Sequence, residues 1–112
     1  MSHAMKTLSL LSALALAGVS GLARADAAAG HEKAKQVCAA CHGEAGDKPI
    51  QPEYPVLAGQ HPDYLMKALR DYKSGQRKNP VMGGMAQPLT AKEIRDLADW
   101  FSSQTGPLRV KR

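Results

Sequence analysis

Apolar residues recur in two stretches of the chain at the spacing of an amphipathic helix. The stretches are residues 62–75 and 90–104, and the pattern i, i+3, i+4, i+7 places the apolar positions of each on one helix face. The two stripes consist of Leu65, Ala68, Leu69 and Tyr72, and of Ile94, Leu97, Ala98 and Phe101. We therefore predict two helices that bury these faces in a common core.

Signals at the ends of both stretches support this prediction. Pro62 suits the first turn of a helix, because its missing amide hydrogen is not needed there, and Gly75 is a typical stop. Thr90 and Glu93 have the spacing of a capping box, in which each side chain satisfies a free backbone group of the first turn. A further helix is expected over about residues 28–38.

The segments between these helices are rich in glycine and proline. Residues 43–60 hold three prolines, and residues 75–89 contain two adjacent glycines and two methionines. We predict both as long loops, which are usually functional or disordered. No stretch alternates apolar and polar residues as a strand does, so the predicted fold class is all-α.

The first 25 residues have the layout of a secretory signal peptide. Lys6 is the only charge before an apolar run over residues 8–17, and Ala23 and Ala25 provide an A-x-A cleavage site. We predict cleavage after Ala25, a mature domain of residues 26–112, and a periplasmic location. An uncleaved anchor is the alternative, although the apolar run is marginal for a spanning helix. Because no second apolar run follows, the mature domain is not expected to span a membrane.

Composition limits what this domain can be. The chain has 112 residues, 44% hydrophobic but only 4% aromatic, which suits one small domain whose core needs a disulfide, a metal or a large cofactor. Two cysteines allow at most one internal disulfide. The formal net charge is +5, or +3 without Lys6 and Arg24, and no basic stretch is interleaved with aromatics. Nucleic-acid binding is therefore not expected.

One motif indicates which large cofactor could complete the core. Residues 38–42 read C-x-x-C-H, with Cys38, Cys41 and His42 as the fixed positions, and this is the attachment signature of c-type haem. Two thiols one helical turn apart can each add to a vinyl group at the haem edge, and the imidazole that follows can reach the iron. We predict one covalent haem c, packed against the apolar side chains. These are Leu57, Leu65, Leu69, Val81, Leu97 and Phe101.

Other uses of the two cysteines fit the sequence less well. A thioredoxin-like redox pair belongs beside a β-α-β pattern, which is missing, and a structural zinc site needs four ligands. His31 or His61 could join the motif, but the sequence has no second C-x-x-C and no H-x-x-x-H. A local disulfide is compatible with an oxidising compartment, but it leaves His42 without a role.

The sixth iron ligand decides what such a haem can do. An open sixth position permits small-ligand binding or peroxidase chemistry, whereas a thioether closes the iron and favours electron transfer. Met82 and Met85 are the main candidates. Met66 is expected to pack inside its helix, and His61, at a helix start, is expected to be exposed.

Local sequence favours Met82 over Met85 as this ligand. Pro80 stiffens the approach to Met82 through its fixed φ, and Gly83-Gly84 would let the chain turn away from the ring. Met85 would then pack near the haem as a polarizable filler.

Taken together, these segments resemble class I c-type cytochromes, most closely single domains of the cytochrome c4 and c553 group. The resemblance rests on the C-x-x-C-H-G motif and on residues 54–60, 82–86 and 89–101, and it covers essentially the whole mature chain. It implies a small cytochrome c fold of three to five helices around one haem, with His42 and Met82 as axial iron ligands. It also implies that the Pro55 carbonyl accepts a hydrogen bond from the His42 ring.

The resemblance also implies where the pocket lies and what the protein does. The expected haem pocket includes Pro55, Leu57, Gly59 and Met85. The implied function is one-electron transfer in a respiratory chain, not catalysis on a small-molecule substrate. A quinol–cytochrome c reductase or a dehydrogenase would be the donor, and a terminal oxidase or reductase the acceptor. Cytochrome c4 itself has two haem domains and this chain has one motif, which favours a monohaem carrier.

Two other functions stay open at this point. The chain could be an electron-transfer subunit of a dehydrogenase or oxidase complex, or, with an open haem, a sensor or peroxidase-like enzyme. A carrier would present the exposed haem edge to its partner, and basic residues around the two loops would steer an acidic partner to that edge. These residues are Lys48, Lys73, Arg77, Lys78 and Lys92.

Overall fold

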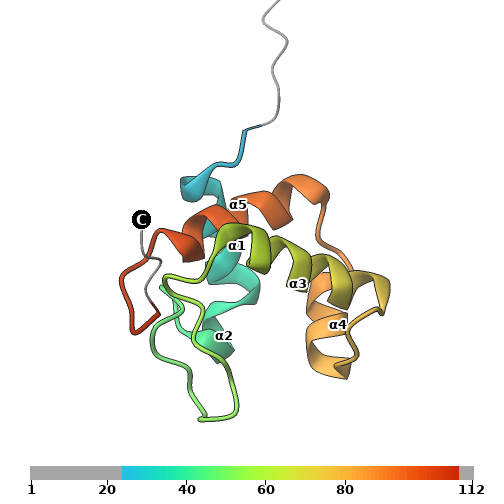
Figure 1. Cartoon of the computed structure of the whole chain (residues 1–112), viewed down its shortest axis with the longest axis horizontal. Coiled ribbons are helices and arrows are strands. Elements are labelled where there is room, and N and C mark those ends of the chain that lie inside the picture. Colours follow the sequence, from blue (N-terminus) through green and yellow to red (C-terminus); the bar gives the residue numbers. More distant parts are fainter. Residues whose placement is uncertain (1–23, 109–112) are drawn as a thin grey trace, which may run out of the picture.

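The computed structural model describes residues 24–108, which form five helices (Figure 1). They are α1 (Ala27–Val37), α2 (Ala39–His42), α3 (Pro62–Ser74), α4 (Pro80–Ala86) and α5 (Ala91–Ser102). No strand occurs in this range, so the predicted all-α fold class is confirmed. None of these helices is long and apolar enough to cross a bilayer. The predicted signal segment, up to residue 23, lies outside the described residues.

The helix boundaries agree with the local signals in the sequence. The α3 helix begins at Pro62 and ends before Gly75, whose φ of 83° gives the left-handed conformation that a glycine adopts without strain. The α5 helix opens with the predicted capping box. The Thr90 hydroxyl accepts from the Glu93 amide at 3.1 Å, and the Glu93 carboxylate accepts from the Thr90 amide at 3.0 Å.

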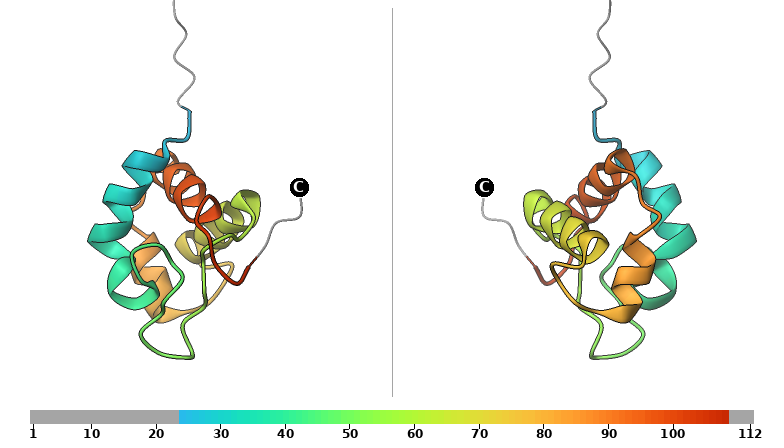
Figure 2. Two further views of the ribbon diagram at one scale, coloured as in Figure 1. Left: turned by 90° about the vertical axis from the view of Figure 1, so that its left-hand side faces the viewer. Right: turned by 90° about the vertical axis from the view of Figure 1, so that its right-hand side faces the viewer.

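The core lies where α5 packs against α1 and α3, and α3 also packs against α4 (Figure 2). Ile94 and Leu97 are its largest fully buried side chains. Both predicted stripes reach this core, with Leu69 and Tyr72 partly buried at its edge. The buried core residues are Ala34, Leu65, Ala86, Leu89, Ile94, Leu97, Ala98 and Phe101.

The crossing of α1 and α5 depends on one glycine. A Cβ atom on Gly30 would lie 2.0 Å from the backbone carbonyl oxygen of Asp96, a distance that real side chains do not tolerate. The two helix backbones therefore meet directly at Gly30. No local sequence signal marks Gly30 as a contact with a partner so distant in the chain.

The predicted loop over residues 75–89 was wrong in its middle part, which forms α4. The Asn79 side chain caps this helix, since its oxygen accepts from the Val81 and Met82 amides, each at 3.0 Å, and Pro80 occupies the first turn. Gly83 and Gly84 are ordinary helical residues without a positive φ. They do not turn the chain away after Met82, so the predicted role of these two glycines was wrong.

Candidate haem site

The C-x-x-C-H motif forms a tight turn at the end of α1. Cys38 ends α1 and precedes α2, and its carbonyl oxygen accepts from the Cys41 amide at 3.2 Å and the His42 amide at 3.0 Å. The two cysteines therefore lie one helical turn apart, the separation that attachment to one haem edge requires. Both thiols are free and partly buried.

The environment of Cys38 argues against a reactive redox pair. Its side chain packs against the hydrophobic core, and this burial raises the pKa of the Cys38 thiol to about 11. Redox-active cysteines have lowered pKa values, because they need the thiolate at neutral pH. Within residues 24–108 no three His, Cys, Asp or Glu side chains come together as a metal site.

His42 is held in one orientation by its surroundings. Its side chain is buried, and Nδ1 lies 2.9 Å from the Pro55 carbonyl oxygen. A carbonyl only accepts, so Nδ1 carries the hydrogen of this contact, and Nε2 is the ring nitrogen that it leaves unengaged. The Tyr54 ring lies beside it, with 6.2 Å between ring centroids. This is the hydrogen bond that the resemblance implied, and it leaves Nε2 available to a metal ion.

The segment that carries Pro55 is fixed to the rest of the fold on both sides. The Leu57 amide donates to the Gly46 carbonyl at 2.8 Å, and the Gly59 amide donates to the Phe101 carbonyl at 2.9 Å. Gly59 has a φ of 81°, and a Cβ there would lie 2.2 Å from the Leu108 carbonyl oxygen. Gly59 thus holds this segment against the end of α5. Its predicted place in the haem pocket stays a prediction.

The two candidate methionines sit on α4. The backbone of Met82 is fixed in the first turn by the Asn79 cap, and its side chain is partly buried. Met85 follows nearly one turn later and is 46% exposed. The other candidates behave as expected, since Met66 packs against the core and His61 is exposed.

Comparison with known proteins decides the family. A family model described as Cytochrome c matches residues 27–105. The chain belongs to the cytochrome c family. Cytochrome c4 of Pseudomonas aeruginosa is 45% identical over 97 residues, which make up 85% of this chain and 47% of that protein. Cytochrome c-554(548) of Halomonas halodenitrificans is 44% identical over 82 residues, or 70% of this chain and 96% of that protein.

The solved structures agree with the cytochrome c assignment. Reduced cytochrome c4 from Pseudomonas stutzeri matches with a TM-score of 0.67 and 43% identity over 73% of this chain and 47% of that one. The chain spans about half the length of the cytochrome c4 relatives it matches. Membership of this family brings one covalent haem c with its iron, and Cys38 and Cys41 fit the C-x-x-C-H attachment of that haem.

The residues present fit a haem. The donor set is suitable: two free thiols, one imidazole with a free Nε2, and thioethers on α4. In Figures 1 and 2, α2 and α4 both lie below α5. On α4, Val81 and Met85 are 56% and 46% exposed, although they are apolar. A large apolar cofactor would cover such side chains. Two apolar side chains predicted to pack near the haem, Val81 and Met85, lie outside the core and its edge. The others lie in the core or at its edge, namely Leu57, Leu65, Leu69, Leu97 and Phe101.

A hollow directly after the C-x-x-C-H motif brings His31, Glu44 and Trp100 together in contacts that the sequence did not predict. His31 stacks on the Trp100 ring with 3.9 Å between centroids, and its Nε2 lies 2.6 Å from a Glu44 carboxylate oxygen. The Trp100 indole donates to the Glu44 carbonyl at 3.0 Å. These contacts fix the chain just after His42. No sequence signal reveals them, because they join α1, α5 and a loop.

The basic residues predicted to surround the two loops, here called the basic rim, offer fewer available charges than the sequence suggested. The Lys73 ammonium donates to the carbonyl oxygens of Gln87 and Leu89, and Lys92 pairs with Asp96 at 2.6 Å. Both lysines therefore have internal partners, which lowers their value for docking. Arg77 lies over the Tyr72 ring at 4.8 Å from its centroid and donates to the Tyr64 hydroxyl at 3.4 Å. Both partners are on uncharged side chains, and Arg77 is exposed.

Proposed function

We propose that this cytochrome is a periplasmic carrier that moves one electron at a time between redox proteins of a respiratory chain. One haem c would be bound through Cys38 and Cys41, with His42 and Met82 as axial ligands of the iron. The observation that carries the proposal is the 2.9 Å contact between His42 Nδ1 and the Pro55 carbonyl. It orients the imidazole so that Nδ1 is engaged and Nε2 is left for the iron, directly beside two thiols with the spacing for attachment.

The residues around the haem would each have a defined task. Bound haem supplies a one-electron redox centre whose potential is set by its axial ligands and by its burial. The Pro55 carbonyl fixes the His42 ring and raises the basicity of Nε2. The thioether of Met82 would close the sixth position and keep small ligands from the iron. Partly buried Leu57 and Leu69 would exclude water from the ring.

The names of two relatives support a partner of the dehydrogenase class. One is the thiosulfate dehydrogenase electron acceptor of Thiomonas intermedia, 45% identical over 58% of this chain. The other is the cytochrome subunit of sulfide dehydrogenase of Chlorobaculum tepidum, 38% identical over 59%. These names favour a second candidate function, an electron-transfer subunit held against a dehydrogenase. Purification from the native periplasm separates the two, since a subunit co-elutes with its enzyme and a free carrier does not.

Export is part of the proposal. The A-x-A site before Asp26 supports cleavage by a signal peptidase after Ala25, and residues 26–112 would form the exported domain. Haem attachment to a C-x-x-C-H motif and release into the periplasm would then give the working carrier.

The experiment that tests the function combines mass and spectrum. Intact mass spectrometry of the periplasmic protein should show one added haem that survives acid–acetone extraction, and a pyridine haemochrome assay should give a c-type spectrum. The reduced protein should not bind carbon monoxide. A haem-free folded protein or a zinc-loaded protein overturns the proposal. Carbon monoxide binding to the native protein instead supports an open-haem sensor or peroxidase-like enzyme.

Docking can be tested by ionic strength. Lys48 and Lys78 are exposed, and with Arg77 they are the members of the predicted rim whose charges stay available for a partner. If they steer an acidic partner, the bimolecular oxidation rate with that partner should fall as salt rises, because exposed charges are screened. Rates that do not depend on salt would contradict steering by this rim and leave the carrier function intact.

A further inference from the structure

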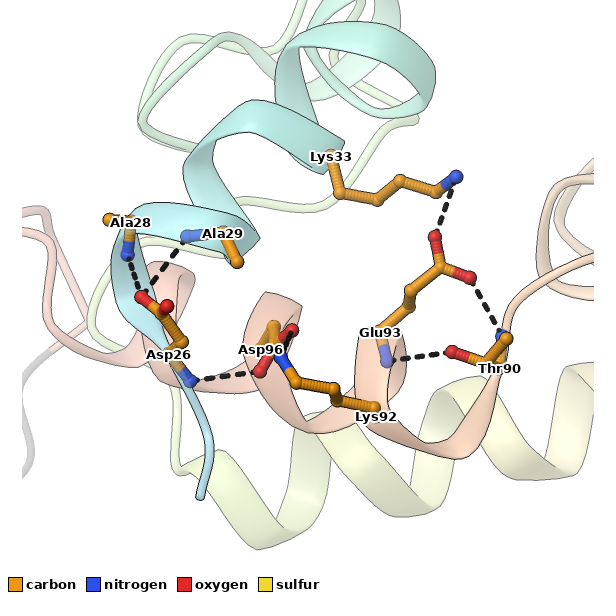
Figure 3. Close-up of polar contacts among 8 residues, drawn as sticks. All are labelled: Asp26, Ala28, Ala29, Lys33, Thr90, Lys92, Glu93 and Asp96. Atoms are coloured by element: carbon orange, nitrogen blue, oxygen red, sulfur yellow. Dashed lines mark hydrogen bonds and ion pairs between the residues drawn. The ribbon is translucent and has the colours of Figure 1, made fainter. Parts of the chain in front are cut away.

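The start of α1 contacts a buried carboxylate on α5. The backbone nitrogen of Asp26 donates to Oδ1 of Asp96 at 2.8 Å (Figure 3). Asp96 is only 3% exposed, and its other oxygen accepts from the Lys92 ammonium at 2.6 Å. A carboxylate this deeply buried is costly unless charged or hydrogen-bonded groups compensate it. In the unprocessed chain its two partners are one lysine and one neutral amide.

Hydrolysis after Ala25 changes the chemistry of the amide. The bond between the Ala25 carbonyl carbon and the Asp26 nitrogen breaks, and a water molecule adds its hydroxyl to the carbon and its hydrogen to the nitrogen. The new amine takes up a further proton at neutral pH, because free α-amino groups have pKa values of about 7.7 to 8.0. The neutral donor thus becomes an ammonium group on the same nitrogen atom.

We propose that removal of residues 1–25 creates an ion pair between the new α-ammonium group of Asp26 and the buried carboxylate of Asp96, which fastens α1 to α5. The inference rests on the cleavage that the proposed function includes. Cleavage of the leader would then have a structural role, because it creates a positive charge whose partner, the Asp96 carboxylate, is already in place.

The charges around this nitrogen favour the added positive charge. The Asp26 carboxylate caps α1, accepting from the Ala28 amide at 2.9 Å and the Ala29 amide at 3.2 Å. Before cleavage, this nitrogen therefore belongs to a residue with one carboxylate and contacts a second, Asp96, whose charged partner is Lys92 (Figure 3). The ammonium group restores the balance.

Two further features bear on how well the surroundings stabilise the new ammonium group. The partial positive charge at the start of α1 opposes an ammonium group there, but the capping carboxylate already lies against the same amides. Farther along the two helices, Lys33 and Glu93 form their own pair at 2.7 Å and so leave no excess charge near the new group (Figure 3).

The position of the ion pair gives it a consequence for the haem site. Asp96 is also the residue whose backbone carbonyl meets Gly30 at the crossing of α1 and α5. An ion pair here ties the first turn of α1 to the same point of α5. Because α1 leads directly into Cys38, fixing its start also fixes the direction from which the attachment motif is presented.

The proposal has a pH signature that the unprocessed chain lacks. An ion pair raises the pKa of the α-amino group in the folded state above its unfolded value. The added stability is therefore fully present below about pH 7.7 and is lost as the pH rises through the folded pKa. An amide nitrogen does not titrate in this range, so a chain in which this nitrogen remains an amide shows no such loss.

The test uses holo-protein purified from the periplasm and a variant with Gly-Ser inserted after Ala25. After cleavage this variant begins two residues earlier, so Asp26 keeps an amide nitrogen and the ammonium group moves away. We expect its folding equilibrium constant at pH 6.5 to be about tenfold lower than that of the native mature protein, the size expected of a charged hydrogen bond. The difference should shrink by pH 9.5. Denaturant unfolding followed by circular dichroism measures it.

Asp96→Asn provides the matched control, because it removes the charge and keeps the shape. In that background the insertion should have no effect on the folding equilibrium constant at either pH. An equal stability of native and extended proteins at both pH values overturns the ion pair. Intact mass shows whether the mature chain begins at Asp26, and any other first residue overturns the proposal at its first step. Covalent haem and electron transfer are measured separately, so their failure is distinguishable from both results.

Discussion

At the crossing of α1 and α5, protein atoms meet protein atoms with no space to spare, since a Cβ on Gly30 would lie 2.0 Å from a carbonyl oxygen. At α4 the situation is the opposite. A Cβ on Gly84 would have nothing within 4 Å, and the apolar side chains of Val81 and Met85 are exposed. The first region is complete in the polypeptide alone. The second has apolar surface that bound haem would cover, so the cofactor would add to a core that the protein alone leaves thin.

Removal of the haem attachment should break this comparison most strongly. In the variant with Cys38→Ala and Cys41→Ala we expect no covalent haem and a loss of stability on the order of 5 kcal/mol or more, because a large apolar plate no longer covers its pocket. Hydrogen exchange should show the amides of α4 exposed well before those of α5. Equal loss of protection in the two helices would contradict the view that α4 depends on the cofactor.

Adding one methyl group at Gly30 and one at Gly84 tests whether the two regions differ in how tightly they are packed. Gly30→Ala should cost about 3 kcal/mol or more in the free energy of unfolding, because two backbones must move apart. Gly84→Ala is the matched control and should change it by less than about 1 kcal/mol, since alanine suits a helix better than glycine does. Denaturant titrations of both holo-proteins measure the effects. Similar losses at the two positions would show that haem packs as tightly on α4 as α5 packs on α1.

The methionine pair sharpens the picture of α4 as the cofactor-dependent region. Met82→Ala should abolish the weak iron–sulfur absorption band of the oxidised protein, open the iron to cyanide and carbon monoxide, and lower the reduction potential. Met85→Ala removes the same side-chain atoms and is the matched control. It should keep the band and lower the free energy of unfolding by about 1 kcal/mol. The opposite behaviour of the two variants would assign the ligand to Met85 and leave the electron-carrier function unchanged.

The same contrast explains what the sequence could and could not predict. Local signals were reliable: the stripes of α3 and α5, the stop at Gly75 and the capping box at Thr90 all act within one helix. The C-x-x-C-H motif is also local, and covalent chemistry dictates its spacing. The α4 helix was missed because two glycines outweighed the signal of Asn79 and Pro80, although capping and packing against α3 stabilise it.

Contacts between distant parts of the chain could not be predicted from the sequence. The 2.0 Å approach at Gly30, the buried carboxylate of Asp96 and the stack of His31 on Trp100 each join residues far apart in the chain. No periodicity encodes them, and Asp96 is a polar residue next to the apolar stripe of α5. The hydrogen bond between His42 and Pro55 was expected only through the family resemblance, since spacing alone does not reveal it.

The smallest expected effect concerns Glu93 on α5, which contacts α1 and the start of its own helix. Its carboxylate accepts from Lys33 at 2.7 Å and from the Thr90 amide at 3.0 Å, and these contacts lower the pKa of Glu93 to about 2. A folded pKa below the unfolded value of about 4.3 means stabilisation that is present above that pH and lost as the pH falls toward 2. Glu93→Gln keeps an acceptor for the cap and removes the charge. We expect the free energy of unfolding of wild type to exceed that of this variant by about 0.5 to 1 kcal/mol at pH 6. The difference is small because solvent screens a partly exposed ion pair, and it should disappear between pH 5 and pH 2. Urea unfolding across that range measures the gap, and a difference that stays constant with pH would assign the effect to helix capping alone.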